Sequence, residues 1–231
     1  MDFDRIKNSA LRRLAFFLKS NKHLDVPRNT VLNTILENEY GHAKSKELNQ
    51  CINKENKPIP WFTYPAIEYL QQLNLNDKTV LEWGAGNSSL FFSARAKIIC
   101  SIEHNLEWYN KISSFKIANQ DLQYRDESKY VEAIKDFNRK FDVIIIDGIL
   151  REKCAVISLE FIMDGGLLIL DNSDRDPQIS EFLRGNNFIE VDMHGFGPIN
   201  DYTWTTSLFF KRDFNFKPLG NQPTIPIGGG Y

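Results

Sequence analysis

The sequence has few cysteines and no long apolar run. Its three cysteines, Cys51, Cys100 and Cys154, follow neither the spacing of a metal site nor that of a disulfide framework. We therefore expect free thiols and a cytoplasmic protein, because the cytoplasm keeps thiols reduced. A membrane-spanning helix needs roughly 18 apolar residues in a row, and no run reaches this length. The first residues also lack the pattern of a signal peptide, so we expect no membrane span.

The sequence also lacks an excess of charge of one sign. Lysine and arginine together number 28, and aspartate and glutamate 30, which gives a net charge of −2. Proteins that bind nucleic acid usually carry a basic surface, so we expect no nucleic-acid partner. The chain of 231 residues is long enough for one domain with a substantial core and an extension.

A glycine turn stands at the centre of the chain. The stretch Thr79–Ser89 reads TVLEWGAGNSS. Its apolar start predicts a buried strand, Gly84 and Gly86 predict a tight turn, and Ser88 and Ser89 are placed to cap a following helix. Such a turn lets a ligand approach the backbone closely, and the free N–H groups of the helix start favour a polar or anionic group. A plain strand-to-helix turn is the alternative interpretation.

Three later apolar runs also end in polar residues. The first ends at Glu103, the second at Asp147, and the third at Asp171 and Asn172. Glu103 follows Gly84 by 19 residues. An α/β nucleotide fold places the carboxylate that holds a ribose at roughly this distance, about 20 residues on. Runs of this kind predict a parallel sheet with a ligand site at the carboxyl ends of its strands.

Predicted strands and helices alternate along most of the chain. This βαβ pattern predicts an α/β fold with a doubly wound, right-handed, mostly parallel sheet. The last two strands are joined by a glycine-containing loop and predict a closing hairpin. The predicted strands are 79–83, 98–102, 122–124, 142–146, 166–170, 188–193 and 205–210, and the predicted helices are 66–73, 88–96, 106–113, 129–137, 154–161 and 178–183.

The chain divides into an N-terminal extension with a linker (1–57), a main domain (58–215) and an irregular tail (216–231). Apolar residues of segment 1–22 recur at steps of three and four with basic residues around them, which predicts an amphipathic helix. We interpret it as packing on the domain or on a second subunit, as in a homo-oligomer; a membrane-surface helix is the alternative. A second helix is predicted at 29–39, and the polar segment 42–57 as a linker or mobile loop.

These features together resemble the class I S-adenosylmethionine-dependent methyltransferases. The residues LEWGAG of Leu81–Gly86 match the family's first motif, acidic-x-Gly-x-Gly, with Ser88 where a third glycine is usual. The resemblance covers about residues 59–211. It implies S-adenosylmethionine as cofactor and a seven-stranded Rossmann-like methyltransferase fold with an antiparallel closing hairpin. It also implies that Glu82 lies near the methionine end of the cofactor.

The resemblance implies further cofactor contacts. Glu103 is expected to accept hydrogen bonds from both ribose hydroxyls, and His104 to pack against the adenine. Asp126 and Glu127 are expected to accept from the adenine amine, with ordinary helix caps as the alternative. Thr63 and Tyr64 are expected either as a lid at the methionine end or as purely structural residues. The predicted cofactor site is completed by Glu82, Gly84, Gly86, Ser88, Ser89 and Asp147.

Asp147 is the main candidate for catalysis, because the resemblance places the transferred methyl group at the end of the fourth strand. It can orient the acceptor, act as a base or bind a metal. Asp147, Asp171 and Asn172 resemble the magnesium ligands of the cation-dependent catechol-type O-methyltransferases, in which the metal lowers the pKa of a coordinated hydroxyl. Hydrogen-bonding and capping roles are the alternative for Asp171 and Asn172.

Two more side chains are catalytic candidates. Arg151 can clamp an anionic acceptor, or it can pair with Asp147 or Glu152. His194 is a second candidate base, beside the aromatic, glycine-containing loop 195–204 that we expect to shape the acceptor pocket.

We therefore expect methyl transfer to an oxygen of a small molecule or glycan precursor. Asp147 is followed by Gly-Ile-Leu and not by the Pro-Pro-aromatic motif of amino-methylating enzymes of nucleic acids, so oxygen is favoured over nitrogen. The alternatives are aminopropyl transfer in the same pocket and a non-catalytic cofactor-binding scaffold.

Overall fold

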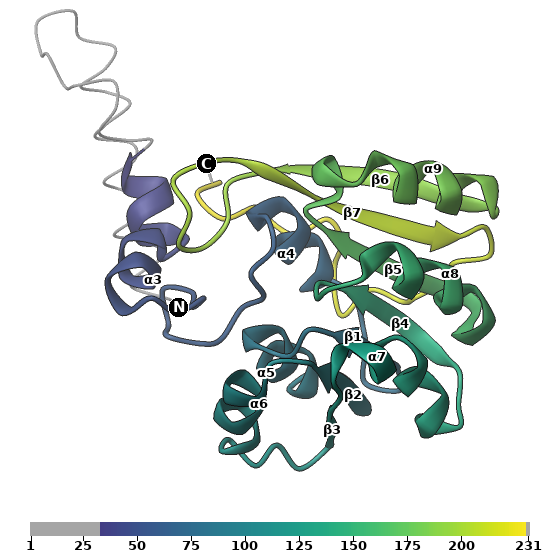
Figure 1. Cartoon of the computed structure of the whole chain (residues 1–231). Coiled ribbons are helices and arrows are strands. Elements are labelled where there is room, and N and C mark those ends of the chain that lie inside the picture. Colours follow the sequence, from purple (N-terminus) through teal and green to yellow (C-terminus); the bar gives the residue numbers. More distant parts are fainter. Residues whose placement is uncertain (1–32, 230–231) are drawn as a thin grey trace, which may run out of the picture.

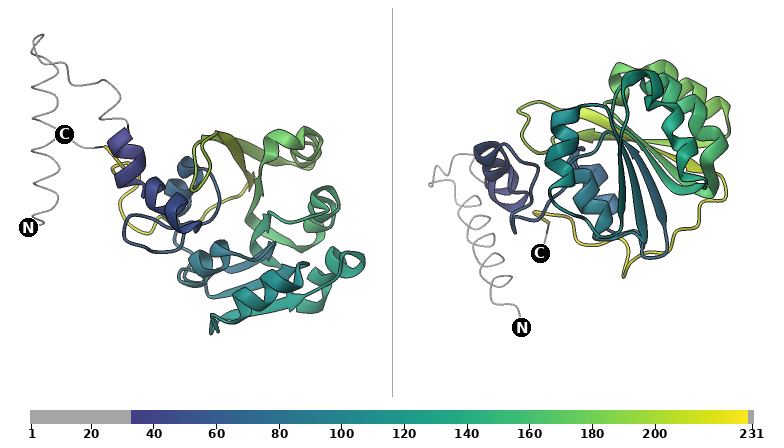
Figure 2. Two further views of the ribbon diagram at one scale, coloured as in Figure 1. Left: turned by 60° about the vertical axis from the view of Figure 1, so that its left-hand side comes forward. Right: turned by 60° about the horizontal axis from the view of Figure 1, so that its bottom comes forward.

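The computed structural model describes residues 33–229. The predicted amphipathic helix at 1–22 and the start of the predicted helix at 29–39 lie outside the described residues. The described chain forms one seven-stranded sheet flanked by helices on both faces (Figures 1 and 2).

The sheet has the strand order β3-β2-β1-β4-β5-β7-β6. The five strands from β3 to β5 are parallel, β7 is antiparallel to β5, and β6 is antiparallel to β7. The predicted α/β class, the doubly wound arrangement and the closing hairpin are therefore confirmed. The strands are β1 (Thr79–Trp83), β2 (Ile98–Glu103), β3 (Gln120–Tyr124), β4 (Phe141–Ile146), β5 (Ile162–Asp171), β6 (Phe188–Gly195) and β7 (Trp204–Lys211).

The helices form a layer on each face of this sheet (Figure 2). Apolar residues of α4 and α5 pack on one face, and those of α7, η2, α8 and α9 on the other. The helices are η1 (Ile35–Glu39), α3 (His42–Leu48), α4 (Tyr64–Leu70), α5 (Asn87–Ser93), α6 (Leu106–Ser113), α7 (Glu127–Tyr130), η2 (Glu132–Phe137), α8 (Arg151–Phe161), η3 (Ser173–Arg175) and α9 (Pro177–Gly185).

Strand β4 shows why the central strands are continuous apolar runs. Val143 and Ile145 point into the core on the α4–α5 face, and Ile144 and Ile146 into the core on the opposite face. All four side chains are fully buried. Burying each stabilises the fold by about 1.5–3 kcal/mol. Both faces are covered, so no alternation with polar residues is expected or found.

The predicted linker at 42–57 is wrong in its first half, which forms helix α3. His42 is buried because its ring lies against the closing hairpin, with Nδ1 3.1 Å from the carbonyl oxygen of Gly197. Ser45 is also buried, and its hydroxyl donates to the carbonyl oxygen of Ile52 at 2.7 Å. These long-range contacts hold a segment whose composition alone suggests a loop.

The tail runs along α4 and η1 without forming a helix or strand in residues 216–229. The N–H of Leu219 donates to the carbonyl oxygen of Gln72 at 2.7 Å. Gly228 packs directly against the side chain of Ile35. In the described part of the chain, no helix combines the length and the apolar content that crossing a bilayer requires.

Candidate functional site

The glycine turn joins β1 to α5 and lies against the end of β4. Gly84 has a φ of +96°, and a Cβ at this position would lie 2.9 Å from the carbonyl oxygen of Asp147. Both the left-handed backbone and the close approach of the two strand ends therefore require glycine here. The requirement comes from the protein itself.

At Gly86, by contrast, neither the backbone nor the packing of the protein requires glycine. Its φ of −177° is extended backbone, and the nearest atoms to an added Cβ would be Trp108 Nε1 at 3.8 Å and Ser88 Oγ at 3.9 Å. The protein thus leaves room for a side chain, and glycine keeps the loop surface open. Such an open backbone at a helix start suits the close approach of a ligand.

Glu103 lies at the end of β2, directly beside this turn. Its side chain is buried and accepts hydrogen bonds from the backbone N–H of Ala85 at 3.0 Å and of Asn105 at 2.7 Å. Each carboxylate oxygen has further lone pairs. The structure therefore fixes a carboxylate next to the open glycine, as the predicted ribose contact needs, and the contact itself stays a prediction.

Glu82 is fully buried under the turn. Its carboxylate accepts hydrogen bonds from the hydroxyls of Ser88 at 2.8 Å, Ser101 at 2.6 Å and Ser89. Burial raises the pKa of Glu82 to about 7, although these three hydroxyls lower it. Glu82 thus holds the start of α5, and its oxygens face serine hydroxyls instead of an open pocket.

The predicted capping role is confirmed for Ser89, which forms a capping box with the first turn of α5, and is wrong for Ser88. The N-cap of α5 is Gly86, not a serine. Ser89 Oγ accepts from the N–H of Gly86 at 3.1 Å, while Ser88 Oγ donates to Glu82. The polar Ser101 inside the otherwise apolar strand β2 was a usable signal for this network, and the sequence interpretation missed it.

Two buried polar atoms near Glu103 have no hydrogen-bond partner among the described residues: His104 Nδ1 and the hydroxyl of Tyr130. Their rings pack edge to face at 5.5 Å, and His104 Nδ1 lies 3.2 Å from Glu103 Oε1 without hydrogen-bond geometry. The hydroxyl of Tyr130 lies under Gly148, where a Cβ would come within 1.9 Å of it. Buried polar groups are normally paired, so these two fit a site for the polar groups of a nucleoside. No sequence pattern pointed to Tyr130.

Asp126 lies at the start of α7 and is exposed. Its carboxylate accepts from the backbone N–H of Ser128 at 3.0 Å and also from the Ser128 hydroxyl. This side-chain hydrogen bond lowers the pKa of Asp126. The structure therefore shows the capping role, and the adenine contact stays a prediction.

Thr63 and Tyr64 are buried between α4 and the closing hairpin. The hydroxyl of Thr63 donates to the carbonyl oxygen of Met193 at 2.7 Å, and the N–H of Tyr64 to that of Phe196 at 2.7 Å. Both residues fasten the segment before β1 to the hairpin. Both residues therefore have the purely structural role that was the alternative to a lid. Neither side chain is exposed as a lid residue would be.

Asp147 and Arg151 meet at the end of β4. The Asp147 side chain is 24% exposed, and its Oδ1 lies 3.4 Å from Arg151 Nη2. Burial and the neighbouring Asp171 carboxylate hold the pKa of Asp147 well above its usual range, while Arg151 acts in the opposite direction. The predicted pairing of Arg151 with Asp147 is confirmed.

The predicted magnesium site is wrong, because side-chain oxygens of its three expected ligands are bound to other residues of the chain. The Asp171 carboxylate is turned toward β7, where Oδ1 accepts from Trp204 Nε1 at 3.0 Å and from the Thr206 hydroxyl at 2.6 Å. The guanidinium of Arg151 lies between Asp147 and Asn172, within 3.4 and 3.3 Å of their side-chain oxygens. Within residues 33–229, no group of three or more His, Cys, Asp or Glu side chains is arranged to hold a metal.

His194 lies on β6, the edge strand of the sheet. It is exposed, and Nδ1 is 2.6 Å from the hydroxyl of Thr205. Strand β6 is three positions from β4 in the sheet, which at about 4.8 Å per strand separates their ends by about 14 Å. The structure therefore does not bring His194 to Asp147.

The N-terminal extension covers part of the site at the carboxyl ends of the parallel strands. The sequence did not predict this cover. The side-chain amide of Asn87, the first residue of α5, donates to the carbonyl oxygen of Cys51 at 2.6 Å. Burial, followed by the charges of Asp147 and Asp171, raises the pKa of Cys51 to about 12. The thiol thus lies in the electric field of the two strand-end carboxylates.

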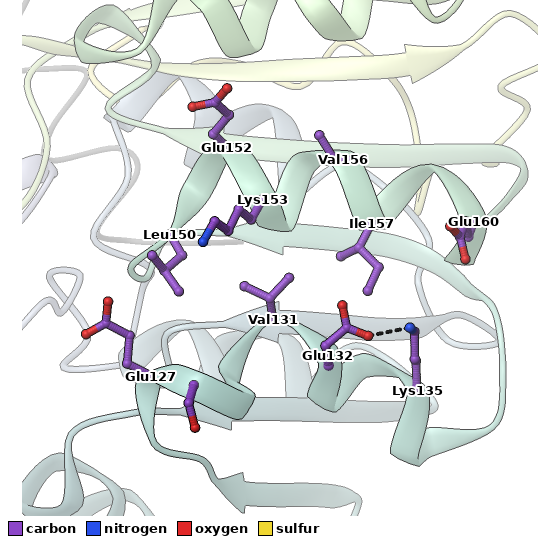
Figure 3. A pocket seen from close by; sticks show the side chains of 11 residues that line it. Glu127, Val131, Glu132, Lys135, Leu150, Glu152, Lys153, Val156, Ile157 and Glu160 are labelled. Atoms are coloured by element: carbon purple, nitrogen blue, oxygen red, sulfur yellow. Dashed lines mark ion pairs between the residues drawn. The ribbon is translucent and has the colours of Figure 1, made fainter.

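A groove of about 920 Å³ runs between α7 and η2 on one side and α8 on the other, and Leu150, just past the end of β4, lines it (Figure 3). Glutamates stand at its rim and apolar side chains line it. Glu132 pairs with Lys135 there. Of the predicted site residues only Glu127 lines this groove, and we assign the chemistry to the strand ends, where the buried carboxylates lie.

The two glycines of the turn make a matched test. Gly84→Ala should lower the free energy of unfolding by about 2 kcal/mol or more, because it places a Cβ at positive φ against backbone atoms. Gly86→Ala should leave the melting temperature nearly unchanged and weaken ligand binding at the turn. Thermal unfolding and calorimetric titration measure the two effects. Equal loss of stability in both variants would contradict the assignment of Gly86 to the ligand.

The buried carboxylate of Glu82 should make stability depend on pH. Its pKa is about 7 in the folded state, against 4.5 for an ordinary glutamate side chain, so the folded state binds more protons in this range. The free energy of unfolding should therefore fall as pH rises from 4.5 to 7, by about 3 kcal/mol for this group. Denaturant unfolding of Glu82→Gln should show a smaller decrease. Glu181→Gln, on the exposed side of α9, is the control and should keep the full decrease.

No protein-family model matches the sequence, and no curated protein sequence matches it. Solved structures do match. The precorrin-6y C5,15-methyltransferase of Geobacter metallireducens GS-15 aligns with a TM-score of 0.50 and 16% identity, over 64% of this chain and 87% of that chain. A putative methyltransferase of Streptococcus mutans in complex with SAH aligns with a TM-score of 0.47 and 14% identity, over 62% and 94%.

The spermidine synthase of Thermotoga maritima also aligns, with a TM-score of 0.47 and 19% identity, over 67% of this chain and 60% of that chain. At these identities the likeness concerns the fold. The strand order, the antiparallel β7 and the match to the Geobacter protein agree on it. The chain has the Rossmann-like fold of the class I S-adenosylmethionine-dependent methyltransferases.

Proposed function

We propose that the protein is an S-adenosylmethionine-dependent methyltransferase. The observation that carries this proposal is the pairing of Glu103 with the glycine turn. A buried carboxylate binds the turn's own N–H group beside Gly86, which leaves the loop open. Two buried atoms find no hydrogen-bond partner within the described chain: the hydroxyl of Tyr130, under Gly148, and Nδ1 of His104, beside Glu103. These groups fit the ribose and adenine of a nucleoside cofactor.

The charge of the site fits a cationic cofactor. Four carboxylates, those of Glu82, Glu103, Asp147 and Asp171, lie at or beside the carboxyl ends of four neighbouring strands, and within residues 33–229 only that of Asp147 pairs with an arginine, Arg151. A sulfonium compound with an ammonium group would reduce the repulsion between these carboxylates. Glu103 and the turn would hold its ribose, and the end of β4 would face its methyl group.

In the proposed reaction, the cofactor supplies an electrophilic methyl group when bound. The residues of the chain align the acceptor hydroxyl with it and take up the hydroxyl proton. Asp147 is the proposed base, with its carboxylate partly open to the site. Its raised pKa makes it a stronger base than an ordinary carboxylate. Arg151, at 3.4 Å, stabilises the ionised form that the reaction needs.

The proposed acceptor is a hydroxyl of a small molecule or glycan precursor. Loop 195–204 adjoins the strand ends, and Trp204 binds Asp171 there. Its side chains Phe196 and Tyr202 are 41% and 53% exposed. Exposed aromatic rings in a loop beside a polar site suit the apolar face of a sugar or a planar molecule. The absence of a nucleic-acid partner stays a prediction from composition.

Calorimetric titration with S-adenosylmethionine, S-adenosylhomocysteine and NAD tests the cofactor first. We expect micromolar binding of both sulfur compounds and none of NAD. Binding of NAD alone would refute the proposal, and binding of neither sulfur compound by folded protein would favour a scaffold role. With an acceptor in hand, mass spectrometry of the product distinguishes a transferred methyl group from an aminopropyl group.

Two variants separate binding from catalysis. Glu103→Ala should weaken binding of S-adenosylmethionine by about 10- to 100-fold, because it removes a charged acceptor. Asp147→Asn should spare binding and lower kcat by about 10²- to 10⁴-fold, as expected on loss of a general base. The acid limb of the pH profile of kcat should disappear with it. Asp164→Asn, an exposed residue of β5, is the control. If Asp147→Asn changed only binding, its catalytic role would be refuted.

A further inference from the structure

The guanidinium of Arg151 is held by four oxygen atoms from two strand ends. Nε donates to the carbonyl oxygen of Gly148 at 3.0 Å, and Nη1 to that of Asp171 at 2.5 Å. Nη2 lies 3.4 Å from Asp147 Oδ1 and 3.3 Å from Asn172 Oδ1. One positive group thus links the residues that follow β4 with those that end β5.

These four atoms are of the kind that hard divalent cations prefer. Carboxylate, amide and carbonyl oxygens are the usual ligands of Mg²⁺, Ca²⁺ and Mn²⁺ in proteins. Burial raises the pKa of Asp147 and of Asp171, and the positive charge of Arg151 lowers both. The guanidinium is thus a cation supplied from within the chain.

We propose that Arg151 is a built-in cation that occupies a latent divalent-cation site at the ends of β4 and β5. The guanidinium neutralises Asp147 and holds the two strand ends at a fixed separation, so the edge is complete without a metal. With its donors engaged by these four oxygens, Arg151 is a positioning residue and does not serve as a clamp for an anionic acceptor.

The proposal predicts that removing the guanidinium creates a metal site. Arg151→Ala should bind Mn²⁺ with a Kd of about 10⁻⁴ to 10⁻³ M, the range of weak protein sites, while the wild type shows no saturable binding. Electron paramagnetic resonance of free Mn²⁺ measures this directly and requires no activity. The double variant Arg151→Ala/Asp147→Asn should lose the site again, because it lacks the one charged ligand.

Arg125→Ala is the matched control. Arg125 also pairs with a carboxylate, that of Asp136, at 2.9 Å, but on the surface. Its other partners are the side-chain oxygen of Gln123 and the backbone carbonyl oxygen of Tyr124. Its removal should create no Mn²⁺ site. Arg151→Lys, which keeps a positive charge, should also bind no Mn²⁺. Saturable binding to either variant, or none to Arg151→Ala, would overturn the proposal.

Folding of the variants is checked by circular dichroism. Arg151→Met keeps the aliphatic part of the side chain and is used beside Arg151→Ala. If both are unfolded without metal, millimolar Mn²⁺ should restore folding, because it replaces the missing cation. Failure to restore it would count against the proposal.

A second readout rests on the proposed function. Once an acceptor is known, wild-type turnover should be unchanged after exhaustive chelation. A loss of turnover on chelation would overturn the internal-cation proposal and leave the methyltransferase assignment intact. The Mn²⁺ titration remains valid even if the protein transfers no methyl group, so the two proposals fail separately.

Discussion

The main constraint on this molecule is the mutual repulsion of carboxylates that meet at one edge of its sheet. Parallel strands bring their carboxyl ends together, and here four of them end in or beside an acidic residue. Each charge is met by a different partner: serine hydroxyls for Glu82, backbone N–H groups for Glu103, an indole and a hydroxyl for Asp171, and the guanidinium of Arg151 for Asp147. Without these partners the edge would be unstable, because buried charges need compensation.

The partners come from widely separated parts of the chain, so the edge depends on the whole fold. Trp204 and Thr206 reach Asp171 only because β7 runs antiparallel beside β5. The N–H of Ala85 reaches Glu103 because β1 and β2 are neighbours. The extension adds a cover through Cys51 and α5. A site of this kind cannot be moved to another scaffold residue by residue.

The strands, their order along the chain and the position of Glu103 could be predicted from the sequence, because apolar runs and residue spacing determine them. The sequence was insufficient where the outcome depends on which way a side chain turns. Asp171 and Asn172 have the composition of metal ligands, yet β7 and Arg151 take up their oxygens. The polar residues of α3 suggested a loop. The segment is a helix, and the contact of His42 with the closing hairpin helps to hold it in place. Such outcomes depend on partners that local patterns do not contain.

The contacts of the N-terminal extension also bear on the order of folding. Ile35 packs against Gly228, and His42 lies against Gly197. A ribosome produces the extension first and these partners last. Contacts of such long sequence separation are slow to form, because a long loop must close first. The earliest part of the described chain to be synthesised therefore completes these contacts only after the closing hairpin and the tail have been made.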